Sequence, residues 1–95
     1  MTDQERLTVL KKDLQMLTDS NDDYLKLLLE QAKAQVEREG VELSVGIEGD
    51  MAVIQYAAYL FRKRAGGETA MPRFLRLQLN NMKISQAGRG ERNDL

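Results

Sequence analysis

The chain has 95 residues, of which 42% are hydrophobic and 5% aromatic, and its formal net charge is −1. This length corresponds to one small domain that buries about 60–65% of its unfolded surface, which leaves little room for a deep substrate cavity. The sequence contains no His and no Cys. The usual general base near neutral pH, the thiolate nucleophile and the soft metal ligands are therefore missing. We expect a non-enzymatic protein without metal or cofactor, which acts by contact in a reducing compartment.

The charges are unevenly distributed along the chain. Residues 1–50 hold 12 acidic and 6 basic side chains, whereas residues 51–95 hold 3 acidic and 8 basic. Halves of opposite sign can attract copies of the same protein head to tail; ordinary solubilising charge is the alternative.

The N-terminal segment is too polar for a signal peptide. The longest apolar stretch, 51–61, has about half the length of a membrane-spanning helix, so we expect a soluble protein without membrane contact.

A first helix is expected over about residues 3–17. Thr2 and Glu5 match the capping box, in which each side chain accepts a hydrogen bond from a free backbone amide at the helix start. One apolar stripe follows at steps of three and four residues, formed by Leu7, Leu10, Leu14 and Leu17. The polar run after it predicts a turn that caps the next helix with Ser20 or Asn21.

A second helix is expected over about residues 21–39, ended by Gly40. Leu27 lies off its apolar face, which consists of Leu25, Leu28, Leu29, Ala32 and Val36. Four residues between positions 19 and 30 also match positions one, three, five and twelve of a calcium loop, namely Asp19, Asn21, Asp23 and Glu30. Tyr24 occupies the sixth position, which requires Gly, so we interpret these residues as helix-capping and not as a metal site.

Apolar and polar residues alternate over residues 41–48, with the period of a strand. The apolar members are Val41, Leu43, Val45 and Ile47. Because the sequence contains no second strand pattern for pairing, we expect an extended loop. Its apolar residues either cover the core or form an arm that docks on another subunit.

A third helix is expected over about residues 50–64, with Asp50 as its cap. From residue 51 to residue 61 only Gln55 is polar, so this helix is apolar nearly all round and is predicted to be the buried centre of the fold. It ends in the basic run 62–64, where cations suit the helix C-terminus.

A fourth helix is expected over about residues 72–86, with Pro72 in its first turn. At about 100° per residue, an inner stripe is formed by Leu75, Leu79 and Met82, and Leu77 and Ile84 lie nearly opposite. This second stripe leaves apolar surface in water unless another molecule covers it; single exposed residues are the alternative. The candidate subunit-interface residues are therefore Val41, Leu43, Val45, Ile47, Leu77 and Ile84.

A polar stripe on the same helix contains side-chain types that contact phosphates and base edges, namely Arg73, Arg76, Asn80 and Lys83. We consider it a candidate contact with a portal protein, a neighbouring subunit or DNA; a solvated face is the alternative. The links before the third and fourth helices, about nine and seven residues, are longer than the turn of a helix-turn-helix motif.

Residues 87–95 form a polar tail that is expected to be flexible. The expected organisation is thus one helical domain, 1–86, and this tail.

Three segments of the chain resemble the small head–tail connector, or adaptor, proteins of tailed phages and prophages, which also include DNA-packaging and head-completion proteins. They are Leu7-x-x-Leu10-Lys11-x-x-Leu14, Asp23-x-Leu25-x-x-Leu28-Leu29-x-x-Ala32-x-x-x-Val36 and Ile54-x-Tyr56-Ala57-x-x-Leu60-Phe61-x-x-Arg64. Pro72 and the segment from Phe74 to Met82 resemble the final helix of the family. The resemblance covers about residues 5–84. The chain departs from the family in its strand-like loop and in Gly66 and Gly67.

This resemblance implies an all-α fold and a structural role. Subunits are expected to form a ring homo-oligomer below the portal, in the virion neck; monomers before assembly are compatible with this role. The ring joins the portal to a tail-side neck protein and extends the channel through which DNA passes without being read. Assembly is expected in the host bacterial cytoplasm. The alternative function is a small helical DNA-binding protein of phage packaging or regulation.

Overall fold

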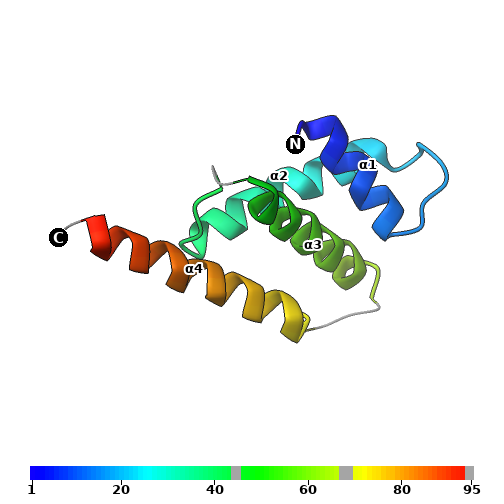
Figure 1. The fold of residues 1–95 in the computed structure, drawn as a ribbon. Coiled ribbons are helices and arrows are strands. Elements are labelled where there is room, and N and C mark those ends of the chain that lie inside the picture. The colour runs from blue at the N-terminus through cyan, green and yellow to red at the C-terminus, as the bar shows by residue number, and fades with distance from the viewer. Residues whose placement is uncertain (44–45, 67–69, 94–95) are drawn as a thin grey trace.

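Four α-helices follow one another along the chain: α1 (Asp3–Asp13), α2 (Asp22–Arg38), α3 (Gly46–Arg64) and α4 (Arg73–Asn93) (Figure 1). The computed structural model describes residues 1–43, 46–66 and 70–93, the stretch 87–93 by its backbone alone. No strand occurs among these residues. The predicted all-α bundle of four helices is therefore confirmed.

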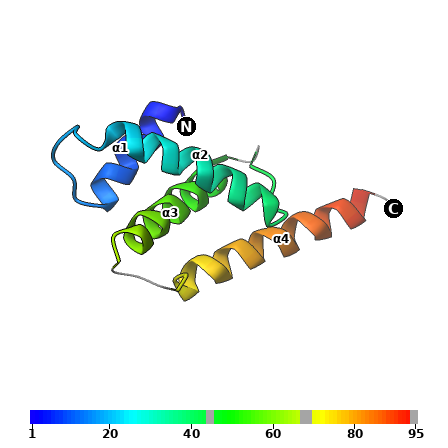
Figure 2. The same cartoon turned by 180° about the vertical axis from the view of Figure 1, so that it is seen from behind.

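The helix α3 is the centre of the fold and packs against α1, α2 and α4 (Figures 1 and 2). Its most deeply buried residues are Ala52, Val53, Ile54, Ala57 and Ala58. The neighbouring helices add further core side chains, most of them leucines: Leu7, Leu10, Leu25, Leu28, Leu29, Ala32, Val36, Leu75, Leu79 and Met82. The prediction that the third helix is buried is confirmed, because its apolar residues face three other helices at once.

The helix α1 begins at the predicted capping box. The Thr2 hydroxyl accepts a hydrogen bond from the backbone N–H of Glu5 (3.1 Å), and the Glu5 carboxylate accepts one from the backbone N–H of Thr2 (2.9 Å). Two backbone amides at the helix start are thus satisfied by side chains.

The end of α1 lies earlier than predicted, at Asp13 instead of residue 17. Gln15 has a positive φ of 58°, and its backbone N–H donates to Lys12 (3.1 Å). The backbone N–H of Met16 donates to Lys11 (2.9 Å), which completes a Schellman motif. Met16 packs against the core in place of Leu17, which is 97% exposed. The expectation that Leu17 belongs to the apolar stripe is wrong, because the chain has already left the helix.

The helix α2 ends through the same motif. Gly40 has a φ of 95°, and Val41 donates its backbone N–H to Val36 (3.3 Å). Both valines are buried, which is the apolar contact that accompanies this cap. Val41 is thus a core residue, and its expected place in an accessible subunit interface is contradicted.

At the start of α2, Asn21 occupies the N-cap position but makes no side-chain capping bond.

The segment 41–48 is not one extended loop. Residues 46–48 already belong to α3, which begins four residues before the predicted start at Asp50. Val45 lies outside the described residues. Leu43 is half-buried against the core, and Ile47 is 70% exposed. A strand needs a partner strand for its backbone hydrogen bonds. In a helix the carbonyls of residues 46–48 instead accept from backbone N–H groups of the same segment, four residues later.

The helix α4 begins one residue after its predicted start and continues to Asn93, beyond the predicted end at Gln86. Figures 1 and 2 show it alongside α3 and continuing past the other helices. The backbone of the expected tail, 87–95, is therefore helical as far as Asn93; its side chains lie outside the described part of the structure.

Candidate interaction surface on the fourth helix

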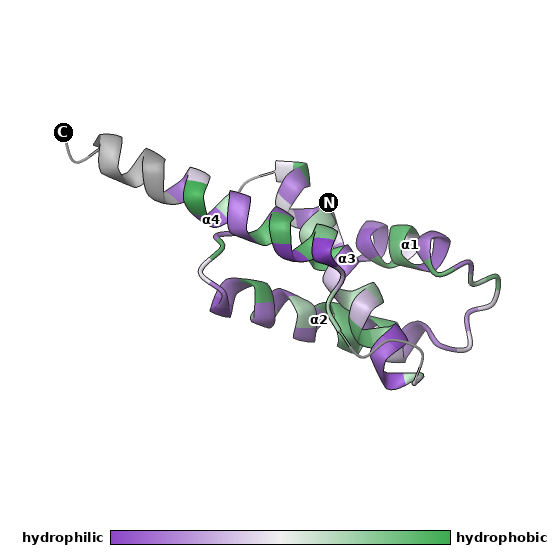
Figure 3. Cartoon of the chain, turned by 90° about the horizontal axis from the view of Figure 1, so that it is seen from below, coloured by the Kyte–Doolittle hydropathy of each residue, from purple (hydrophilic) through white to green (hydrophobic). Residues whose placement is uncertain are grey.

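Two opposite faces of α4 are apolar. The inner face packs on the core through Leu75, Leu79 and Met82, each at most 5% exposed. On the other side, Phe74 is 67%, Leu77 52% and Ile84 70% exposed. In Figure 3 apolar and polar bands alternate along the helix. We call Phe74, Leu77 and Ile84 the outer face of α4.

Polar contacts at two points hold α4 against the end of α2. Arg76 donates to the Glu39 carboxylate, with 2.6 Å between Nη1 and Oε2. Further along, the Gln86 side chain accepts from the backbone N–H of Glu42 (2.9 Å) and donates to its carbonyl (3.1 Å). Together with the inner apolar face, these contacts fix the rotation of α4. The outer face is therefore presented in one orientation.

The polar stripe predicted on α4 is only partly available to another molecule. Arg76 is engaged by Glu39, and Asn80 is half-buried. Lys83 lies against the end of α2, with its Cδ 3.7 Å from the position that a Cβ on Gly40 would take. Arg73 is exposed. The four residues share one side of the helix, but two of them contact this chain's own α2 end.

Of the predicted interface residues, the structure brings Leu77 and Ile84 together on α4, as expected from their spacing. Ile47 is exposed at the start of α3, on a different helix. The exposure of Phe74 was foreseeable from the sequence, since its position on the helix falls between the inner stripe and the opposite stripe of Leu77 and Ile84. Leu27, on α2, is 60% exposed; its position off the apolar face was the only sign of this.

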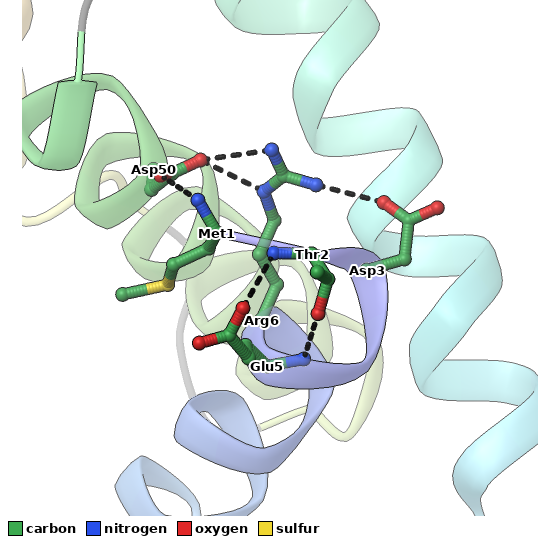
Figure 4. A network of polar contacts seen from close by, with 6 residues as sticks. All are labelled: Met1, Thr2, Asp3, Glu5, Arg6 and Asp50. Atoms are coloured by element: carbon green, nitrogen blue, oxygen red, sulfur yellow. Dashed lines mark hydrogen bonds and ion pairs between the residues drawn. The ribbon is translucent and has the colours of Figure 1, made fainter.

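A charged cluster joins α1 to α3, and local sequence reasoning missed it (Figure 4). Asp50 is 8% exposed and accepts hydrogen bonds from Arg6 Nε and from the Met1 ammonium, both at 2.9 Å. Arg6 also donates to Asp3 (2.7 Å). Burial raises the pKa of Asp50, but the hydrogen bonds from the two cations outweigh it, so this pKa lies below its ordinary value. Asp50 is thus an internal anchor and not the predicted helix cap.

A surface hollow of about 370 Å³ lies beside this cluster, with Arg6, Asp50, Lys33 and Glu37 among its lining residues. Asp50 and Arg6 are bonded to each other across its wall. A carboxylate in this state stays ionised and is held by cations, so it is a poor general base near neutral pH. The hollow therefore offers charge for recognition and no activated nucleophile.

The remaining ionisable side chains with defined partners also serve the fold. Asp19, in the turn before α2, and Asp22, the first residue of α2, both bind Lys11 Nζ, at 2.6 and 2.9 Å. Beside the Arg76–Glu39 pair, burial and then the charge of Glu39 raise the pKa of Tyr56, which keeps its hydroxyl protonated.

Within the described ranges, no group of three or more acidic side chains is arranged to hold a metal ion. No helix among these residues is long and apolar enough to cross a bilayer.

The chain matches no model of a known protein family, no curated protein and no solved structure. A functional assignment therefore depends on its residues and geometry. Of these, the uncovered outer face of α4 is the feature that the fold itself does not explain.

Proposed function

We propose that this chain is a structural protein of a tailed phage or prophage, a head–tail connector subunit. In this role it forms a ring that joins the portal to the tail and extends the DNA channel, in the virion neck. The order and spacing of the three sequence segments described above motivate the family. The uncovered outer face of α4 is the observation that carries the proposal.

Three large apolar side chains on one side of a helix are unfavourable in water unless another surface covers them. Leu77 lies three residues after Phe74, and Ile84 lies seven residues after Leu77, so the three side chains project from one side of the helix with the exposed Asn81 between Leu77 and Ile84. The inner face of the same helix is already satisfied by the core. Among the described residues, none packs over the outer face, and we infer that another molecule covers it.

The charges of the chain favour assembly over catalysis. Residues 51–95 are basic, and residues 1–50 are acidic. A ring of such subunits can place the basic half against a neighbour's acids or against the DNA backbone without reading bases. The absence of His and Cys from the sequence also favours a protein that works by contact.

Electron microscopy of the purified protein at high concentration, alone and with a cognate portal, tests the proposal. Ring-shaped particles or portal-bound density are expected. The double variant Leu77→Asp, Ile84→Asp should lose them, because two carboxylates would be buried in the interface. Leu17→Asp is the matched control, since Leu17 is almost fully exposed on the α1–α2 turn. A protein that stays monomeric at high concentration and does not bind portal particles contradicts the proposal.

The DNA-binding alternative has a separate signature. It predicts a salt-dependent shift of a short duplex that is lost in the double variant Arg73→Ala, Arg76→Ala. The engagement of Arg76 by Glu39 disfavours this alternative. Duplex binding by a protein that forms no particles would replace the connector proposal with it.

A further inference from the structure

We propose that the outer face of α4 binds the outer face of α2 in a second copy of this chain, so that subunits join head to tail. This inference rests on the proposed function and names the surface of the neighbour that covers Phe74, Leu77 and Ile84.

The outer face of α2 is the side opposite its buried leucines. Leu27 is 60% exposed there. Asp23 and Glu30 lie one turn before and one turn after it, and both are exposed. Ala34 continues the stripe seven residues after Leu27 and is exposed as well. This face therefore offers a large apolar residue, a small one that permits close approach, and two carboxylates beside Leu27. Its cation, the exposed Arg38, lies one turn after Ala34, at the far end of the helix.

The outer face of α4 has the complementary composition. Its apolar stripe is flanked by the exposed Arg73, one turn before Leu77. The first turn of α4 contains no acidic residue. Apolar side chains on α4 can therefore meet Leu27, while Arg73 meets Asp23 or Glu30.

Pairing of α4 with α4 of another copy is less favourable. Residues 73–86 contain three basic side chains and no acidic one. Two such helices would bring cations of like sign together across a low-dielectric contact, which is unfavourable. The acidic residues of α2 remove this conflict.

The positions of the two faces determine the form of assembly. Both α2 and α4 pack on α3 (Figures 1 and 2), and their outer faces are different surfaces of the molecule. When the outer face of α4 of one subunit binds the outer face of α2 of another, the pair still has one unbound α2 face and one unbound α4 face. Subunits are then added until the rotation closes a ring, or they continue as a filament.

A single contact of this kind is weak. From residue 74 to residue 84 the helix axis advances about 15 Å. A strip about 10 Å wide along it has an area of about 150 Å², well below the roughly 800 Å² that each partner buries in a stable complex. Assembly is therefore expected only at high protein concentration or on a template such as a portal.

Because the chain has no Cys, single-cysteine variants report this contact directly. Leu27→Cys and Leu77→Cys proteins, one of them carrying a mass tag, are mixed at high concentration and oxidised. The mixed disulfide dimer is expected in at least about tenfold excess over either homodimer, because proximity raises the effective concentration of the two thiols. Leu17→Cys mixed with Leu77→Cys is the control and should show no such excess.

A charge exchange gives a second measurement on the same contact. Arg73→Glu should raise the concentration needed for assembly, and the added change Glu30→Arg should lower it again. If the protein assembles but Leu77→Cys homodimers predominate, α4 pairs with α4, and this inference fails while the proposed function stands. If no particles form, no enriched disulfide forms and the protein does not bind portal particles, both fail.

Discussion

Replacing Gln15 by Gly should stabilise the protein. Gln15 has a φ of 58° in the turn that ends α1, and a left-handed conformation costs a residue with a Cβ about 1–2 kcal/mol. Glycine removes this cost but loses about 0.5–1 kcal/mol more backbone entropy on folding. The difference between these ranges is centred on a net gain of about 0.75 kcal/mol in the free energy of unfolding, or about 3–6 °C in Tm for a domain of this size.

The assay is thermal and urea unfolding followed by circular dichroism, at a concentration where the protein is monomeric. Gln4→Gly is the matched control, because Gln4 is also exposed but lies inside α1. At a helical φ the same substitution should destabilise by about 0.5 kcal/mol. Opposite signs for the two variants are the expected result. A Tm for Gln15→Gly equal to or below that of the unchanged protein would refute the reasoning.

The remaining predictions concern the core, the charged anchor and the outer face. Leu79→Ala should reduce the free energy of unfolding by about 2–4 kcal/mol through a cavity, whereas Leu77→Ala should change it by less than about 0.5 kcal/mol and weaken assembly; equal losses in urea unfolding would contradict this. Asp50→Asn should destabilise by about 1–3 kcal/mol at pH 7. Since the folded pKa of Asp50 lies below the ordinary value, the stability difference should begin to shrink as pH falls below about 4, and a difference that grows with falling pH would contradict the assignment. Arg76→Ala should cost at most about 1 kcal/mol, less at high salt, because its pair with Glu39 is partly exposed.

The order and type of the elements followed from local periodicity. Apolar residues at steps of three and four residues identified the inner faces of the first, second and fourth helices, and the burial of Leu25, Val36 and Leu79 agrees with them. The apolar run from 51 to 61 also identified the central helix. These patterns are reliable because a helix needs no distant partner for its backbone hydrogen bonds.

The errors arose where a distant contact or a backbone angle outweighs the local pattern. Asp50 resembled a helix cap beside Gly49, but Arg6, distant in sequence, supplies its partner. Leu17 continued the leucine spacing, but the positive φ at Gln15 turns the chain away first. In the alternating segment, Val41 and Leu43 pack on the core, whereas Ile47 is on α3. Spacing alone could not separate these three.

The existence of a second apolar stripe on the fourth helix could be predicted from the sequence. Which residues beside that stripe are accessible to another molecule could not. Leu77 and Ile84 could be placed opposite the inner face from their positions in the sequence. That Arg76 is bound by Glu39 while Arg73 is exposed depends on where the end of α2 lies.

By itself the sequence determined an all-α chain with a buried third helix, a two-faced fourth helix and no His or Cys for chemistry, because helix periodicity and residue type are local properties. Only the tertiary structure decided where α1 ends, what Asp50 binds, and which residues of α2 and α4 remain exposed. These outcomes depend on side chains many residues apart that meet only when the helices pack on α3. The surface proposed for assembly is what that packing leaves uncovered.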